Sequence, residues 1–188
     1  MGRKARISKG KQMKPNFFVF CEGETEIAYV KFLRSLYRAP IQVIAKKGKS
    51  NISEDYIERS QNEYVRTEQD KVFLMYDLDV DGMLEQLQKI PNAELIVSNP
   101  CVELWFLLHY QEQKTEISSD KCIKKLQKFS KEYKKGTLSE EEKEVLAKNK
   151  ELAVERAKIM SEYNNPSTTV YKLLLLLSCW CPFYTISF

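Results

Sequence analysis

The sequence has few of the residues that build zinc sites and disulfide frameworks. It contains one histidine and five cysteines among 188 residues, and no two cysteines have the Cys-x-x-Cys spacing that is typical of zinc binding. A chain of this length can fold around a hydrophobic core, so an odd and scattered set of cysteines indicates reduced thiols rather than a disulfide framework. We therefore expect a cytoplasmic protein without structural zinc.

Long apolar segments are also scarce. The uncharged segment 173–188 is shorter than the roughly 20 residues that span a bilayer, and Pro182 interrupts it. The basic N-terminus has no apolar stretch behind it, so we expect no signal peptide and no membrane span. Three interpretations of this segment are open. It is a last core helix with an apolar tail, a contact with a membrane or a partner, or a C-terminus altered by damage or a shift of reading frame. We favour the core helix.

Positive charge is concentrated at the N-terminus. The whole chain has a net charge of +4. Residues 1–15 contain six lysines or arginines and no acid, whereas the rest of the chain is close to neutral. Such a segment is either a flexible, solvated arm or an arm that contacts phosphates.

Hydrophobic spacing predicts an α/β fold. Apolar strands alternate with helices up to Ser98, which is typical of a parallel sheet flanked by helices. Beyond Ser98 the pattern is helical only. We therefore predict an α/β core over 16–98 and a helical extension over 99–188 that completes the same domain. The expected strands are 16–21, 41–45, 72–76 and 94–98, and the expected helices are 25–38, 53–67, 82–90, 100–110, 119–135, 139 to about 165, and one that begins at 165–166.

The first acidic motif follows the first strand. Glu22 lies at the carboxyl end of that strand, which is the edge where open parallel sheets bind ligands. Gly23 would permit a tight turn into the next helix. Glu24 and Glu26 also suit an ordinary helix N-terminus, where acidic residues are favourable.

The second acidic motif is Asp77-Leu-Asp79-Val-Asp81-Gly at the end of an apolar strand. An EF-hand would need a glutamate at the twelfth position, where this chain has Gln88, so a calcium loop is disfavoured. A buried strand end would leave Asp77 and Asp79 as unpaired like charges, and a divalent cation such as Mg²⁺ removes that difficulty. Asp81 also suits a solvated turn.

A third motif follows the fourth strand. Asn99 and Glu103 are four residues apart, so on a helix they share one face and can reach the same sheet edge. His109 is more typical of a packing residue than of a proton-transfer or phosphate-binding group.

Two lysine-rich segments are candidates for nucleic-acid contacts. Residues 46–51 are not a Walker loop, because Val43 stands where that motif needs glycine, but Lys47 and Lys49 can contact phosphate or lie in a solvated loop. A basic stripe on the helix predicted from Ser119 is either a solvated face or a wall for a nucleic-acid backbone. Its members are Lys121, Lys124, Lys125, Lys128 and Lys135.

An apolar strand with Glu-Gly followed by an apolar strand with Asp-x-Asp resembles the Toprim fold of primases, topoisomerases and overcoming-lysogenization-defect nucleases. In that fold the glutamate and the aspartates meet at one sheet edge and bind magnesium. More narrowly, four blocks in order resemble the RloB-like family: "FVFCEGETEIAYVKFL", "DLD", "SNPCVELWFLLHY" and "NPSTTVYKLL".

The resemblance implies roles for individual residues. Glu22 would be the catalytic acid–base or a metal-associated carboxylate, and Asp77 and Asp79 would bind Mg²⁺ or Mn²⁺, with Asp81 as a helper. Glu26 and Glu103 would be further acidic residues of the catalytic site.

The resemblance also implies a magnesium-dependent nuclease for DNA or RNA, transfer RNA included, that acts in phage defence with an RloA-like ABC-type ATPase. Two other interpretations stay open. One is a non-catalytic, metal-stabilised module that binds nucleic acid or a partner. The other is primase or topoisomerase chemistry, for which no zinc ribbon or transesterification domain is visible.

Overall fold

A five-stranded sheet forms the centre of the protein, and the computed structural model describes residues 13–45 and 52–180. The strand order is β2-β1-β3-β4-β5, with β1 to β4 parallel and β5 antiparallel to β4. The α/β class is confirmed, but the sheet is mixed rather than wholly parallel. The strands are β1 (Phe17–Cys21), β2 (Ile41–Ala45), β3 (Lys71–Asp77), β4 (Ala93–Asn99) and β5 (Ser167–Thr168).

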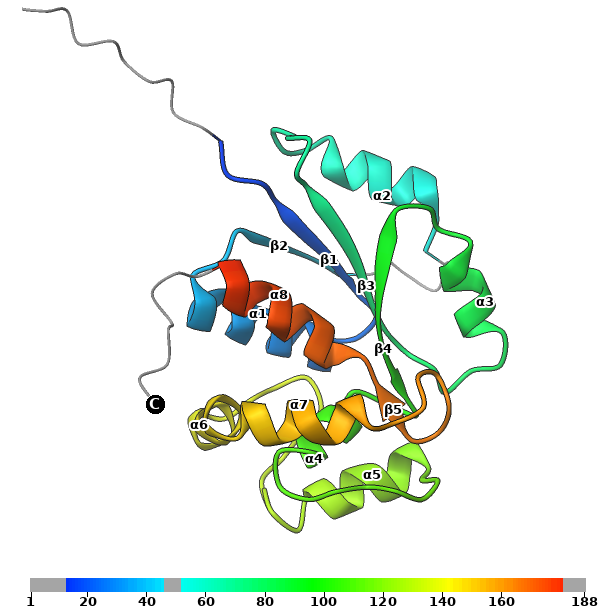
Figure 1. The fold of residues 1–188 in the computed structure, drawn as a ribbon, viewed down its shortest axis with the longest axis vertical. Coiled ribbons are helices and arrows are strands. Elements are labelled where there is room, and N and C mark those ends of the chain that lie inside the picture. The colour runs from blue at the N-terminus through cyan, green and yellow to red at the C-terminus, as the bar shows by residue number, and fades with distance from the viewer. Residues whose placement is uncertain (1–12, 46–51, 181–188) are drawn as a thin grey trace, which may run out of the picture.

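Helices cover both faces of the sheet (Figure 1). One face packs against α1 (Glu24–Tyr37) and α8 (Val170–Trp180), and the other packs against α2 (Glu54–Gln61) and α3 (Met83–Gln88). Successive residues of β1 enter different hydrophobic clusters, because side chains alternate between the two faces of a strand. All of β1 is buried, which explains why its sequence is apolar throughout.

The helices after β4 are shorter than their apolar spacing predicts. Helix α4 begins at Glu103, not at Pro100, and α5 ends at Leu126, not at Lys135. The long helix predicted from Ser139 is two helices that break at Asn149, and Ser139 begins the first of them with a capping box to Glu142. The elements are α4 (Glu103–Leu107), α5 (Ser119–Leu126), α6 (Glu140–Lys148) and α7 (Lys150–Lys158).

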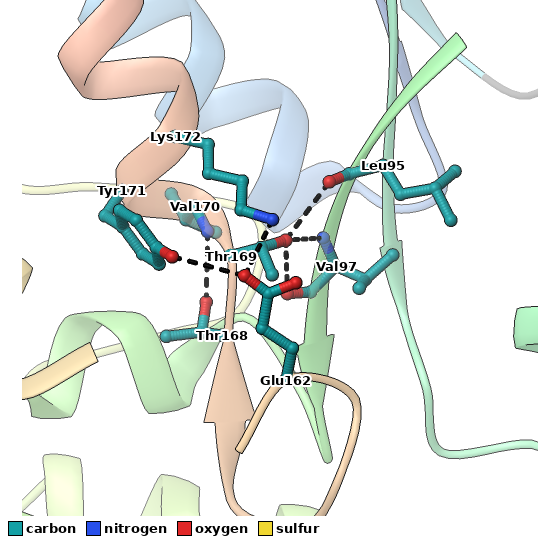
Figure 2. A network of polar contacts seen from close by, with 8 residues as sticks. All are labelled: Leu95, Val97, Glu162, Thr168, Thr169, Val170, Tyr171 and Lys172. Atoms are coloured by element: carbon teal, nitrogen blue, oxygen red, sulfur yellow. Dashed lines mark hydrogen bonds and ion pairs between the residues drawn. The ribbon is translucent and has the colours of Figure 1, made fainter. Parts of the chain in front are cut away.

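The chain returns to the sheet after α7 and is fastened there by Thr169. Its hydroxyl accepts a hydrogen bond from the Val97 N–H at 2.8 Å and lies 3.2 Å from the Leu95 carbonyl (Figure 2). Nearby, Glu162 pairs with Lys172 at 2.7 Å. These contacts attach the last helix to β4 at the side of the sheet.

Three predictions concern residues outside the described ranges or at their ends. Most of the basic arm, the loop with Lys47 and Lys49, and residues 181–188 of the apolar tail lie outside them. The tail's first part is α8, in which Leu173, Leu174 and Leu177 are buried, as the core-helix interpretation expects. Within residues 13–45 and 52–180, no helix is long and apolar enough to cross a membrane.

Candidate functional site

Three neighbouring strands bring their carboxyl ends to one edge. Cys21 is in register with Met75, and Asp77 is in register with Ser98, so β1, β3 and β4 end side by side. Glu22 continues from β1, and its backbone N–H donates to the Met75 carbonyl at 3.2 Å. The Asp77 N–H in turn donates to Glu22 Oε2 at 3.3 Å. The structure thus brings Glu22 and Asp77 together across a gap of 55 residues in the sequence.

Glu26 lies in the first turn of α1, the helix that follows β1, and is only 4 % exposed. Gly23 makes room for it, because a Cβ at that position would be 2.9 Å from Glu26 Oε2. The backbone of Gly23 is extended, a conformation that any residue adopts. The short turn between β1 and α1 therefore does not need the conformational freedom of glycine, and the missing side chain instead admits a buried carboxylate.

Glu103 is the most buried acid of the group, with 1 % of its surface exposed. The Tyr133 hydroxyl donates to its Oε1 atom at 2.8 Å, and Lys135 Nζ lies 4.0 Å from the same atom. Asn99 does not share a helix face with Glu103, because Asn99 is the last residue of β4 and α4 starts only at Glu103. The Asn99 amide instead donates to the Tyr163 carbonyl at 2.9 Å.

Burial and the charges of neighbouring acids together raise the pKa values of two carboxyl groups at this edge. Burial, followed by the charge of nearby acids, raises the pKa of Asp77 from 3.8 to about 9. Burial, followed by the charges of Glu103 and Glu22, raises the pKa of Glu26 to about 7. The acids that act on Asp77 are Glu26, Glu103, Asp79 and Glu22.

These side chains fit a hard divalent cation by their chemistry. Asp77 Oδ1 and Glu103 Oε2 are buried and have no hydrogen-bond partner, and carboxylate oxygens of this kind are the ligands that Mg²⁺ takes. Within the described ranges, no three acidic, histidine or cysteine side chains are grouped closely enough to hold a metal ion. The site as folded is therefore a set of neighbouring carboxylates and not a closed coordination sphere.

Asp79 and Asp81 follow β3 and are both exposed. Asp79 is close enough to raise the pKa of Asp77. Asp81 lies in the turn that leads through Gly82, whose φ of 78° is left-handed, into α3. Asp79 thus borders the carboxylate group, whereas Asp81 stands at a helix start.

The lysines of the basic stripe do not all lie on α5, because the helix ends at Leu126, before Lys128 and Lys135. Lys121, Lys124 and Lys128 are exposed, while Lys125 donates to Gln113 Oε1 at 2.7 Å. Lys135 belongs to the segment after the helix and faces Glu103.

His109 has the contacts of a packing residue. It is 1 % exposed, its Nδ1 lies 2.9 Å from the Trp105 carbonyl, and burial lowers its pKa to about 4. A neutral, buried imidazole is poorly suited to bind phosphate.

Sequence reasoning missed the residues that hold Glu103 in place. Tyr133 lies in the predicted helix 119–135, and Lys135 was expected only as part of a basic stripe. Nothing in the local pattern pairs either with Glu103, about 30 residues earlier, because their meeting depends on where the chain leaves α5.

The carboxylate edge lies wholly within a known family pattern. No curated protein and no solved structure was found to match the chain. The family model described as RloB-like protein matches residues 17–177, which include β1 to β5 and every acid discussed above. The chain therefore belongs to the RloB-like protein family.

Proposed function

We propose that this protein is a magnesium-dependent nuclease of the Toprim type. The observation that carries the proposal is the gathering of Glu22, Glu26, Asp77 and Glu103 at the carboxyl edge of three adjacent strands, with raised pKa values at Asp77 and Glu26. Perturbed acids in such a position are typical of functional sites. Their repulsion costs stability, which is reasonable for residues that serve chemistry.

Asp77, Asp79 and Glu22 are the residues that would hold the cation. A bound Mg²⁺ or Mn²⁺ would supply Lewis-acid polarisation of a phosphate group. The buried Oδ1 atom of Asp77 has no hydrogen-bond partner and could bind the cation. The Glu22 carboxylate is held next to it by the hydrogen bond from the Asp77 N–H. Asp79 is exposed at the rim and adds a further carboxylate.

Glu26 is the group best suited to move a proton. Its pKa of about 7 allows it to be both protonated and deprotonated near neutral pH, which is the condition for general acid–base catalysis. Burial is the main cause of that raised pKa, and the nearby Glu103, whose side chain accepts a hydrogen bond from Tyr133, raises it further. Glu22 retains the alternative role of acid–base residue that the family resemblance implies.

A nucleic acid is the proposed substrate. The exposed lysines Lys121, Lys124 and Lys128 on α5 and just beyond it supply positive charge for a phosphate backbone. The resemblance to proteins of bacterial defence loci adds the proposal that the enzyme acts in the cytoplasm against phage, with an RloA-like ATPase as its partner. A second candidate is the non-catalytic, metal-stabilised module, in which the same carboxylates hold a structural cation and the exposed lysines of α5 bind nucleic acid or a partner.

Cleavage assays distinguish these functions. Wild-type protein, Glu22→Gln and the matched control Glu24→Gln, an exposed glutamate two residues away, are incubated with DNA, RNA and transfer RNA in Mg²⁺ or Mn²⁺. We expect wild type and Glu24→Gln to cleave at least one substrate, and Glu22→Gln to be slower by about 100-fold or more. Full activity of Glu22→Gln would place the chemistry elsewhere, and absence of cleavage by wild type would favour the binding module.

A further inference from the structure

The chain crosses the carboxylate site after α5. We call residues 133–136 the strap. Tyr133, 3 % exposed, anchors one end by its hydrogen bond to Glu103. At the other end the Gly136 N–H donates to Thr25 Oγ1 at 2.9 Å, in the first turn of α1.

Gly136 is required for this close approach. Its φ of 81° is left-handed, and a Cβ there would lie 3.0 Å from Glu24 Cβ. The strap is therefore fixed at both ends against the two elements that carry the buried acids. Lys135 lies between the two anchors.

Lys135 directs its charge at the site. Its Nζ lies 4.0 Å from Glu103 Oε1, although its side chain is 60 % exposed. Partial burial alone would lower the pKa of Lys135, but attraction to Glu103 and Asp77 raises it overall. The ammonium group thus offsets part of the negative charge that a metal ion would otherwise neutralise.

We propose that Lys135 is an internal counterion of the carboxylate site and weakens its affinity for divalent cations. The inference rests on the proposed function, because it assumes that the carboxylates named there bind the cation. The Lys135 ammonium beside Glu103 and a divalent cation held by the neighbouring carboxylates would repel each other, so each reduces the other's binding. Because the lysine stem is flexible and mostly exposed, the ammonium can move into solvent when the cation binds.

The test is a Mn²⁺ titration followed by electron paramagnetic resonance of the free ion. The proteins are wild type, Lys135→Gln, Lys135→Arg and, as a matched control, Lys134→Gln at the exposed neighbouring position. We expect Lys135→Gln to bind Mn²⁺ about tenfold more tightly at low ionic strength, with a smaller difference in high salt. Lys135→Arg keeps the charge and should stay within about twofold of wild type, as should Lys134→Gln.

Unchanged or weaker Mn²⁺ binding by Lys135→Gln would overturn the inference. Asp77→Asn separates that failure from failure of the proposed function. If wild type binds Mn²⁺ and Asp77→Asn does not, the cation site stands even where Lys135 has no effect. If Asp77→Asn binds as wild type does, the cation site is wrong and the inference falls with it.

Discussion

Replacing Asp77 with asparagine should stabilise the cation-free protein at alkaline pH. The folded-state pKa of Asp77 is raised from 3.8 to about 9, so between these values the folded protein binds more protons than the unfolded chain. Stability is then highest below the ordinary pKa and is lost as the pH rises through the folded-state value. Asparagine has no proton to lose, so this loss should largely disappear in the variant.

The size of the effect follows from the burial of the carboxyl group. At pH 8 the folded protein keeps a proton on Asp77 roughly four units above its ordinary pKa, which costs about 6 kcal/mol. The buried Oδ1 atom of Asp77 has no hydrogen-bond partner, so the asparagine amide of the variant would also be buried without one. This lowers the stability of the variant by about 1–3 kcal/mol. We expect a net gain of about 3–5 kcal/mol, which raises Tm by roughly 6–20 °C in a chain of this size.

The assay is thermal unfolding followed by circular dichroism at pH 5, 6.5 and 8 with EDTA. Wild type should lose stability as the pH rises, Asp77→Asn should lose much less, and the exposed control Asp81→Asn should follow wild type. Added Mg²⁺ should stabilise wild type at pH 8 but not Asp77→Asn. A Tm of Asp77→Asn at or below that of wild type at pH 8 in EDTA would refute the reasoning.

Two further substitutions test close contacts. Gly23→Ala should displace Glu26, because the new Cβ would be 2.9 Å from Glu26 Oε2. Because that oxygen is the end of a flexible side chain, we expect at most about 1 kcal/mol lost in chemical denaturation but a clear fall in cleavage rate, and a wild-type cleavage rate would contradict the close approach. Thr169→Val should lower the free energy of unfolding by about 1–3 kcal/mol, because the buried Val97 N–H loses its hydrogen-bond acceptor. The folded variant should cleave as fast as wild type. An unchanged midpoint of chemical unfolding would show that this contact with β4 is dispensable.

The strands of the core could be predicted closely because their signals are local. The apolar run of β1 and the β-branched run of β2 each stop at a charged or polar segment, and both strands end where the pattern predicts. The two-residue strand β5 has no such signal. It exists because Ser98 and Asn99 offer partners to residues about 70 positions later, which no local pattern records.

The candidate site was predictable in its strand-borne acids but not in their surroundings. Glu22 directly follows β1 and Asp77 ends β3, and parallel strands end at a common edge, so their meeting follows from topology. The end of α5 at Leu126 could not be predicted in the same way, because the helical spacing continues to Lys135. The chain leaves the helix there so that Tyr133 can reach Glu103, a contact made only in the folded protein.

One comparison of cleavage rates tests most directly whether the carboxylate edge is a catalytic centre. Wild type, Asp77→Asn and Asp81→Asn, purified identically, are assayed on the best substrate at saturating Mn²⁺, with circular dichroism to verify folding. The account predicts that Asp77→Asn is folded and slower by about 100-fold or more, while Asp81→Asn stays near wild type. Equal rates for wild type and a folded Asp77→Asn would contradict it.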